Sequence, residues 1–365
     1  MDPRSTPRLP YLDALRGYAI IAVIAVHTEQ VAPLSSTVAK AYAQHGRYGV
    51  QLFFVVSAVS IAMTWHARGD GYQPFLVRRL FRLLPALAVA TIGYAAINGV
   101  PEWWQVVMTL TFTDGLHPAA VNSVVPGTWT LSAEMMFYLS VPLLAASIRS
   151  LRCAAIWILA AEAVALAAGP AVHAFWRIAN PGGGAANADY FGVSMVANAK
   201  WFILGWTTYL LMRRPRLAPR ASRALFGLAV ACLLVAPFIP SSTLHDLAFM
   251  FGIPAAVYAM SCGAASVLDN AVMRWVGTVS YSMYLWHFIV WNISYRIGQP
   301  PFLPLFAGAL ALTTLCASVT YALIERPGKR IGNALARMRR KSPLDSTAAP
   351  YRAVAASDPP RSPHR

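Results

Sequence analysis

Charged residues are scarce in this sequence, and acidic residues are the scarcest of them. Only 12% of its 365 residues are charged, whereas roughly a quarter are charged in a typical soluble domain. Fourteen are Asp or Glu, 30 are Lys or Arg, and 57% of all residues are hydrophobic. This composition excludes an ordinary soluble protein. We expect no nucleic-acid partner, because the positions of the basic residues account for the basic excess.

Cysteine is also scarce, and long polar stretches are missing. The four cysteines, Cys153, Cys232, Cys262 and Cys316, lie within or beside apolar runs, where single cysteines usually act as small packing residues. We therefore expect no disulfide, no metal site and no redox role. Outside the apolar runs, the stretches near 100–128 and 174–193 have room only for loops, so a membrane domain must hold the whole function.

Long apolar runs dominate the rest of the sequence. Each is about 17 to 25 residues long, which is the length a helix needs to cross a bilayer. Ten spans are predicted, near 10–28, 48–66, 80–99, 129–148, 153–173, 194–212, 223–240, 246–266, 280–297 and 302–324. The segment PEWWQVVMTLTFT at 101–113 is too short to span and reads as re-entrant or surface-lying. The fold class is therefore all-α, a polytopic membrane bundle of about ten transmembrane helices.

The distribution of basic residues fixes the predicted orientation. With the N-terminus inside, 24 of the 30 Lys and Arg residues fall on the inner side and five on the outer side, while Arg16 lies within a helix. This asymmetry places both termini in the cytoplasm. The predicted organisation is a cytoplasmic N-terminus at 1–9, a membrane domain at 10–330 and a basic cytoplasmic tail at 331–365 that is expected to be disordered.

The first span, YLDALRGYAIIAVIAVH, carries Asp13, Arg16 and His27. Arg16 and His27 are eleven positions apart, which puts them on nearly the same helix face but about 16 Å apart along the axis. Asp13 can pair with Arg16 one turn later. A structural alternative is that Asp13 and Arg16 form a snorkelling pair and that His27 lies at the outer interface.

Other predicted spans also carry polar residues that a lipid-facing helix would avoid. They are Gln51 and Ser57 in the second span, Ser132 and Glu134 in the fourth, and Tyr281, Tyr284 and His287 in the ninth. Glu134 should lie about 7 Å below the outer boundary, at a depth similar to that of His27. A histidine oriented by a carboxylate at that depth would serve as a general base. Tyr284 and His287 could instead be packed residues.

Arginines collect at the cytoplasmic start of the third predicted span. The segment RRLFRLLP contains Arg78, Arg79 and Arg82, and the last two share a helix face. The preference for basic residues on the inner side can explain such a cluster. The functional alternative is a phosphate site, because guanidinium groups bind phosphates bidentately.

These segments together resemble the integral membrane acyltransferase-3 family over about residues 10–330. LDALRG with His27 is similar to the arginine-ten-residues-histidine signature of its first helix, and RRLFR to its Arg-two-residues-Arg motif at Arg79 and Arg82. Further family segments are matched, in order, by GVQLFFVVSAVSI, TWTLSAEMMFYL, YSMYLWH and ERP at 325–327. Two departures are Ala58-Val59 for the usual Gly-Phe, and Met135 where many members have a second acid.

The resemblance implies an O-acyltransferase of the bacterial inner membrane. It would move an acyl group, most often acetyl, from cytosolic acyl-CoA to a carbohydrate or lipid-linked hydroxyl acceptor, without a metal. Arg16, Arg79 and Arg82 would hold the donor phosphates, and His27 would be the general base with Glu134 orienting it. The substrate passage would be lined by Ser57, Ser132, Tyr284 and His287. Glu325 and Arg326 are expected to form a structural pair.

Two rival classes stay open at the level of sequence. A secondary transporter would also contain buried His, Glu and Arg, but would be indicated by inverted repeats or paired broken helices, which the sequence does not reveal. The glycine-rich NPGGGAAN at 180–187 falls in a predicted outer loop and has no counterpart in the other half. A lipid-flipping partner of an envelope assembly system is the second rival. Neither the acceptor nor the oligomeric state can be deduced.

Overall fold

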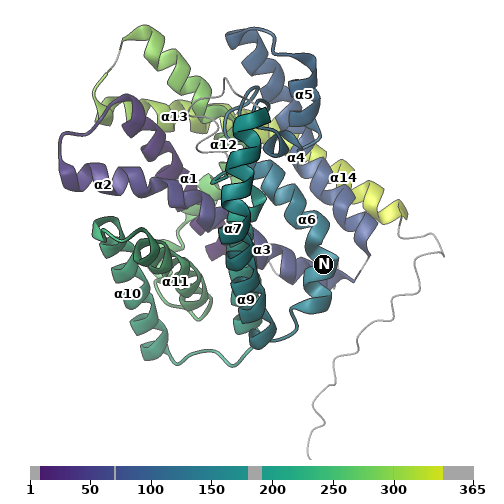
Figure 1. The fold of residues 1–365 in the computed structure, drawn as a ribbon, viewed down its shortest axis with the longest axis vertical. Helices are drawn as coiled ribbons and strands as arrows, with labels where there is room; N and C mark the ends of the chain where they lie inside the picture. The colour runs from purple at the N-terminus through teal and green to yellow at the C-terminus, as the bar shows by residue number, and fades with distance from the viewer. Residues whose placement is uncertain (1–8, 70, 180–190, 299, 340–365) are drawn as a thin grey trace, which may run out of the picture.

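The computed structural model describes residues 9–69, 71–179, 191–298 and 300–339, and within them every regular element is helical. The long helices are α1 (Pro10–Val31), α3 (Gly49–Arg68), α4 (Tyr72–Asn98), α6 (Trp129–Ser147), α7 (Leu151–Ala179), α9 (Met195–Met212), α10 (Pro219–Val235), α11 (Ser242–Ser261), α12 (Ala271–Ile297), α13 (Phe302–Thr320) and α14 (Arg326–Arg339). The short ones are α2 (Thr37–His45) and α5 (Trp103–Leu110). This is the predicted all-α bundle (Figure 1).

Eight helical stretches are long and apolar enough to cross a membrane. The two other predicted spans, at 194–212 and 280–297, correspond to α9 and α12, which have 18 and 27 residues. Helix α5 has eight residues and rises only about 12 Å, so it is too short to span, as predicted. The glycine-rich segment at 180–187 lies outside the described residues.

Local sequence signals explain where several helices begin and end. Ser194, Ser241 and Asn270 precede α9, α11 and α12, and each side chain accepts a hydrogen bond from a backbone N–H of the first turn. Pro10 starts α1, where its missing N–H costs nothing. Gly69 ends α3 in a left-handed conformation, with a φ of 56°.

Helix α1 lies in the interior of the bundle, and α7 lies at its edge. In its most apolar window α1 is 61% buried by protein, whereas α7 is only 6% buried and must present its apolar side chains to lipid. The interior also contains α3, α12 and α6, whose buried side chains join one continuous core. Several polar residues of these central helices are buried in protein, among them Thr28, Ser132 and His287.

Helices α1 and α12 approach closely at two glycines. A Cβ atom at Gly17 would collide with the carbonyl oxygen of Met273, and one at Gly277 would collide with that of Asp13. Small residues of this kind allow the backbones of membrane helices to pack directly against each other. Ten residues further along each helix, the rings of His27 and His287 are neighbours, with centroids 5.2 Å apart. The two helices therefore run parallel and in register.

The C-terminal helix corrects a predicted boundary. Residues 331–339 were expected to belong to a disordered tail, but α14 is helical to Arg339. The reason is that Gly332 packs against Phe81 and Gly328 against Pro85, which docks α14 along α4 (Figure 1). The remainder of the predicted tail, 340–365, lies outside the described residues.

Candidate active site

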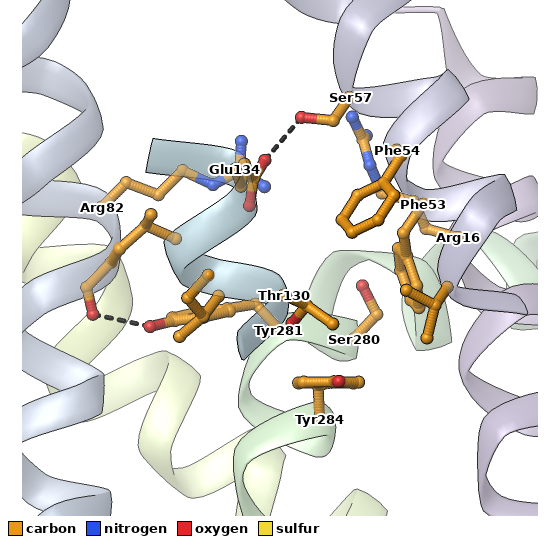
Figure 2. A pocket seen from close by; sticks show the side chains of 13 residues that line it. Arg16, Phe53, Phe54, Ser57, Arg82, Thr130, Glu134, Ser280, Tyr281 and Tyr284 are labelled. Carbon is orange, nitrogen blue, oxygen red and sulfur yellow. Dashed lines mark hydrogen bonds between the residues drawn. The ribbon is translucent and has the colours of Figure 1, made fainter. Parts of the chain in front are cut away.

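A cavity lies among helices α1, α3, α4, α6 and α12. It has about 610 Å³ of empty volume, part of which is open to the outside. Its polar lining residues are Arg16, Ser57, Arg82, Thr130, Glu134, Ser280, Tyr281 and Tyr284. Figure 2 shows Glu134 between Arg16 and Arg82, with Tyr284 across the cavity from them. We call the side with Arg16 and Arg82 the arginine end.

The two arginines of this end are held differently. Arg16 donates from Nη1 to Asp13 Oδ1 at 2.9 Å, which is the predicted pair, and from Nη2 to Ser60 Oγ at 2.8 Å. Arg82 has a buried Nε atom without a hydrogen-bond partner in the described part of the chain. A buried guanidinium donor without a partner, facing a cavity, is suited to an anionic ligand.

Arg79 lies behind this end rather than in the cavity wall. Its guanidinium carbon is 5.4 Å from the ring centroid of Phe75 and 5.6 Å from that of Tyr138. These cation–π contacts fix a positive charge close to the cavity. Arg79 and Arg82, predicted to act together, therefore have different surroundings.

Glu134 does not orient His27, contrary to the prediction. Its Oε1 atom accepts hydrogen bonds from Ser57 Oγ and from Tyr138 Oη, both at 2.5 Å (Figure 2 shows the first). His27 instead has its Nδ1 atom 3.0 Å from Gln30 Oε1. Glu134 thus lies with the two arginines at the cavity, whereas His27 lies about 16 Å along α1 from Arg16.

The loop before α6 belongs to the interior of the bundle. Phe112, Asp114, Val125 and Thr128 are buried, so the chain has already entered the bundle when α6 begins at Trp129. Asp114 accepts from Thr128 at 2.6 Å and from Ser132 at 2.5 Å. Burial raises the pKa of the Asp114 carboxyl above its ordinary value, although these hydrogen bonds act in the opposite direction.

The predicted passage serines separate into two roles. Ser57 lines the cavity and is bonded to Glu134. Ser132 does not line it, because its hydroxyl turns to Asp114 and also accepts from the backbone N–H of Gly115 at 3.2 Å. Ser132 therefore connects α6 to the preceding loop through hydrogen bonds.

The histidine pair, His27 and His287, lies next to the cavity on the side of Tyr284. The ring of Tyr284 lines the cavity and also contacts the ring of His287, with centroids 5.4 Å apart. Its hydroxyl donates a hydrogen bond to the carbonyl oxygen of Gly127 at 3.1 Å. The structure thus brings together His27, His287 and Tyr284, and keeps all three apart from the arginine end.

Sequence reasoning missed one residue, Ser60, and gave another, Glu325, the wrong partner. Ser60 was overlooked, although it is three residues after Ser57 and therefore on the same helix face. Glu325 was expected to pair with Arg326, but it binds Lys329 Nζ at 2.6 Å and accepts from Ser282 at 2.9 Å. The i,i+4 spacing of Glu325 and Lys329 was the available signal.

Among the described residues, no group of three or more His, Cys, Asp or Glu side chains could hold a metal ion. The four cysteines are free thiols. The side chains at and beside the cavity are arginines that can bind an anion, a carboxylate between them, and imidazoles that can accept a proton.

Comparison with known proteins gives a consistent result. A family model described as an acyltransferase domain matches residues 9–322. A Komagataeibacter xylinus protein, provisionally named a membrane-bound transacylase, is 27% identical over 87% of this chain and 82% of its own length. A Bacillus subtilis protein, provisionally named a peptidoglycan O-acetyltransferase, is 25% identical over 87% of this chain.

A Staphylococcus aureus relative, provisionally named an O-acetyltransferase, is 24% identical over 89% of this chain. The chain spans only 54% and 58% of the lengths of the Bacillus and Staphylococcus proteins. No solved structure matches the chain.

Proposed function

The chain belongs to the acyltransferase-3 family, and on that premise we propose that it transfers an acyl group from acyl-CoA to a hydroxyl of the cell envelope. It is a multi-pass membrane O-acyltransferase. The proposed donor is cytosolic acetyl-CoA, and the proposed acceptor is a carbohydrate or another envelope component. The proposed location is the bacterial inner membrane, with residues 10–330 as the acyltransferase domain.

The arginine end is the proposed site of the donor phosphates. Arg16 and Arg82 line the cavity, and Arg79 adds a third positive charge behind it. Both α1 and α4 follow segments predicted to lie in the cytoplasm, so a cytosolic phosphate ligand would meet these side chains first. Guanidinium groups suit this role because each can donate two parallel hydrogen bonds to a phosphate.

His27 is the proposed general base. Its Nδ1 faces the amide oxygen of Gln30, so this nitrogen donates and Nε2 keeps the lone pair that can take a hydroxyl proton. His27 lies about 16 Å along α1 from Arg16, and the pantetheine arm of CoA would bridge this distance. The acyl group would reach His27 after passing Tyr284.

One observation carries this proposal. A single cavity connects two arginines to Tyr284, whose ring contacts that of His287, and one of these arginines has a buried donor without a partner among the described residues. The names of the relatives support an acyl acceptor in the envelope, since one is named for peptidoglycan and another for O-acetyl transfer. Thr130, Ser280 and Ser57 would line the route of the acyl arm.

The test uses the full chain in lipid nanodiscs, supplied with acetyl-CoA and no ion gradient. Release of the CoA thiol is followed with and without a soluble muropeptide acceptor. We expect slow release without the acceptor and faster release with it. His27→Ala should lose the release while CoA binding remains, because the base is far from the phosphates. Absence of any release by the unmodified protein, together with ion-driven flux, would favour a transporter instead.

A further inference from the structure

The side chain of His287 is buried beside the ring of His27. The residue is 3% exposed, and its Nε2 atom has no hydrogen-bond partner among the described residues. Buried polar atoms in native proteins are normally satisfied, so an unsatisfied one needs an explanation. Because His287 lies beside the proposed general base, the explanation can be sought in the reaction.

The proton positions on both imidazoles follow from their partners. His287 Nδ1 is 2.7 Å from the carbonyl oxygen of Tyr284, and a carbonyl can only accept, so Nδ1 carries the hydrogen. His287 Nε2 therefore has a free lone pair. The same reasoning applied to His27 and Gln30 leaves a lone pair on His27 Nε2. Two neighbouring rings thus each offer a proton-accepting nitrogen.

The backbone fixes the two rings relative to each other. Gly17 and Gly277 hold α1 and α12 in direct contact ten residues before the histidines. At the histidines themselves, Trp291 Nε1 donates to the carbonyl oxygen of His27 at 2.8 Å, which ties the helices together again. Phe288 packs against both rings, with centroids 4.4 Å from His27 and 4.1 Å from His287. This supports a fixed arrangement rather than an accidental contact.

We propose that His287 is the positioning partner of His27, and that its Nε2 lone pair accepts a hydrogen bond from the His27 imidazolium formed during acyl transfer. This rests on the proposed function. The acceptor oxygen bonds to the acyl carbon, its O–H bond breaks, and the proton moves to His27 Nε2. The C–S bond then breaks, and the proton passes to the leaving thiolate of CoA.

Between those two events His27 is a cation next to the buried ring of His287, which is 3% exposed. An unpaired charge there is costly, and a neutral imidazole lone pair lowers that cost by accepting a hydrogen bond, directly or through one water molecule. His287 thus takes the role that sequence reasoning gave to Glu134. Tyr284 fixes the required tautomer of His287 through its backbone carbonyl.

Two substitutions that differ by one methylene group separate this role from a structural one. His287→Asn keeps an N–H donor near the position of Nδ1 and can still bind the Tyr284 carbonyl, but it loses the acceptor at Nε2. His287→Gln places an amide oxygen near the position of Nε2 and loses the Nδ1 donor. The readout is CoA thiol release from acetyl-CoA in nanodiscs. His173→Asn, on the peripheral helix α7, is the matched control.

We expect His287→Asn to lower kcat by about 100-fold, in the range of general-base effects, with the KM for acetyl-CoA unchanged. His287→Gln should retain more turnover than His287→Asn, and His173→Asn should behave as the unmodified protein. The reverse order of Asn and Gln, or loss of the fold in both, would overturn the inference by showing that the imidazole is a packing group. Absence of release by the unmodified protein would instead overturn the proposed function, and the inference with it.

Discussion

Two arginines one helical turn apart on α4 have different surroundings in the structure. Arg82 lines the cavity with a buried donor, whereas Arg79 is held between the rings of Phe75 and Tyr138. Arg79 and Arg82 are three residues apart, and this spacing only places both side chains on one helix face. It does not indicate that their surroundings differ. The difference therefore arises from tertiary packing.

This difference predicts unequal effects on donor binding. Arg82→Ala should weaken the binding of CoA by about 10- to 100-fold, because a charge-assisted hydrogen bond contributes about 1.5–3 kcal/mol. Arg79→Ala should weaken it less, since its charge acts from behind the cavity wall. Calorimetric titration of CoA into the nanodisc-embedded variants measures both. A larger effect for Arg79 would contradict the assignment.

Glu134 is the carboxylate that balances the arginine end. Glu134→Gln should lower the free energy of unfolding by about 1–3 kcal/mol, because the two hydroxyl donors lose a charged acceptor. Saturating CoA should then raise the thermal midpoint more in the variant than in the unmodified protein, since phosphates compensate the uncovered positive charge.

The matched control for Glu134 is Glu162→Gln. Glu162 on α7 binds Lys200 at 2.7 Å, away from the cavity, so its loss should leave the stabilisation by CoA unchanged. Thermal unfolding with and without CoA provides the measurement. Equal gains in the Glu134 and Glu162 variants would show that Glu134 has no special relation to the donor site.

The helices themselves could be predicted from the sequence, but the buried path of the loop before α6 could not. The length of the apolar runs predicted nearly every long helix, and the start of α6 at Trp129 was correct. The burial of Asp114 and Val125 before that start could not be foreseen, because a polar loop inside a bundle has no periodic signal. Glu134 was therefore given the wrong partner.

The contact between α1 and α12 is the element on which the histidine pair depends. Gly277→Ala would push a methyl group into the backbone of α1 and should destabilise the protein by about 1–3 kcal/mol, as overpacking does. It should also separate His27 from His287 and reduce turnover. Acetyl-CoA turnover and thermal unfolding of the same preparation measure both effects.

Gly308→Ala is the control for this helix contact. Nothing lies within 4 Å of a Cβ atom built at Gly308 in α13, so this change should be neutral or slightly stabilising, as expected for Gly→Ala in a helix. If both glycine variants behaved alike, the close packing at Gly277 would not govern the site.

The orientation of the whole molecule stays a prediction from its charges. The excess of Lys and Arg on one side of the spans predicts cytoplasmic termini. Reporter fusions after residue 218 should give a cytoplasmic signal, and fusions after residues 120 and 242 a periplasmic one. A periplasmic signal at 218 would reverse the proposed direction of acyl transfer.

Only part of the candidate site could be predicted from the sequence. Ser57 and Tyr284 were singled out because polar residues in apolar spans face protein, and Arg16 and Arg82 as candidate phosphate ligands. All four line one cavity. The neighbourhood of His27 and His287 could not be predicted, because 260 positions separate them and their contact depends on how α1 packs against α12.

The separation of the arginine end from the histidine pair raises the question of whether the membrane potential affects the proposed reaction. In the proposed reaction the acetyl group moves outward while the hydroxyl proton returns to the thiolate, so no net charge crosses the bilayer. The membrane potential contributes about 2.3 kcal/mol per elementary charge at 100 mV, and this contribution should therefore vanish. In sealed vesicles, collapsing the potential with an ionophore should leave the acetylation rate unchanged. A rate that followed the potential would mean that an ion accompanies the acyl group.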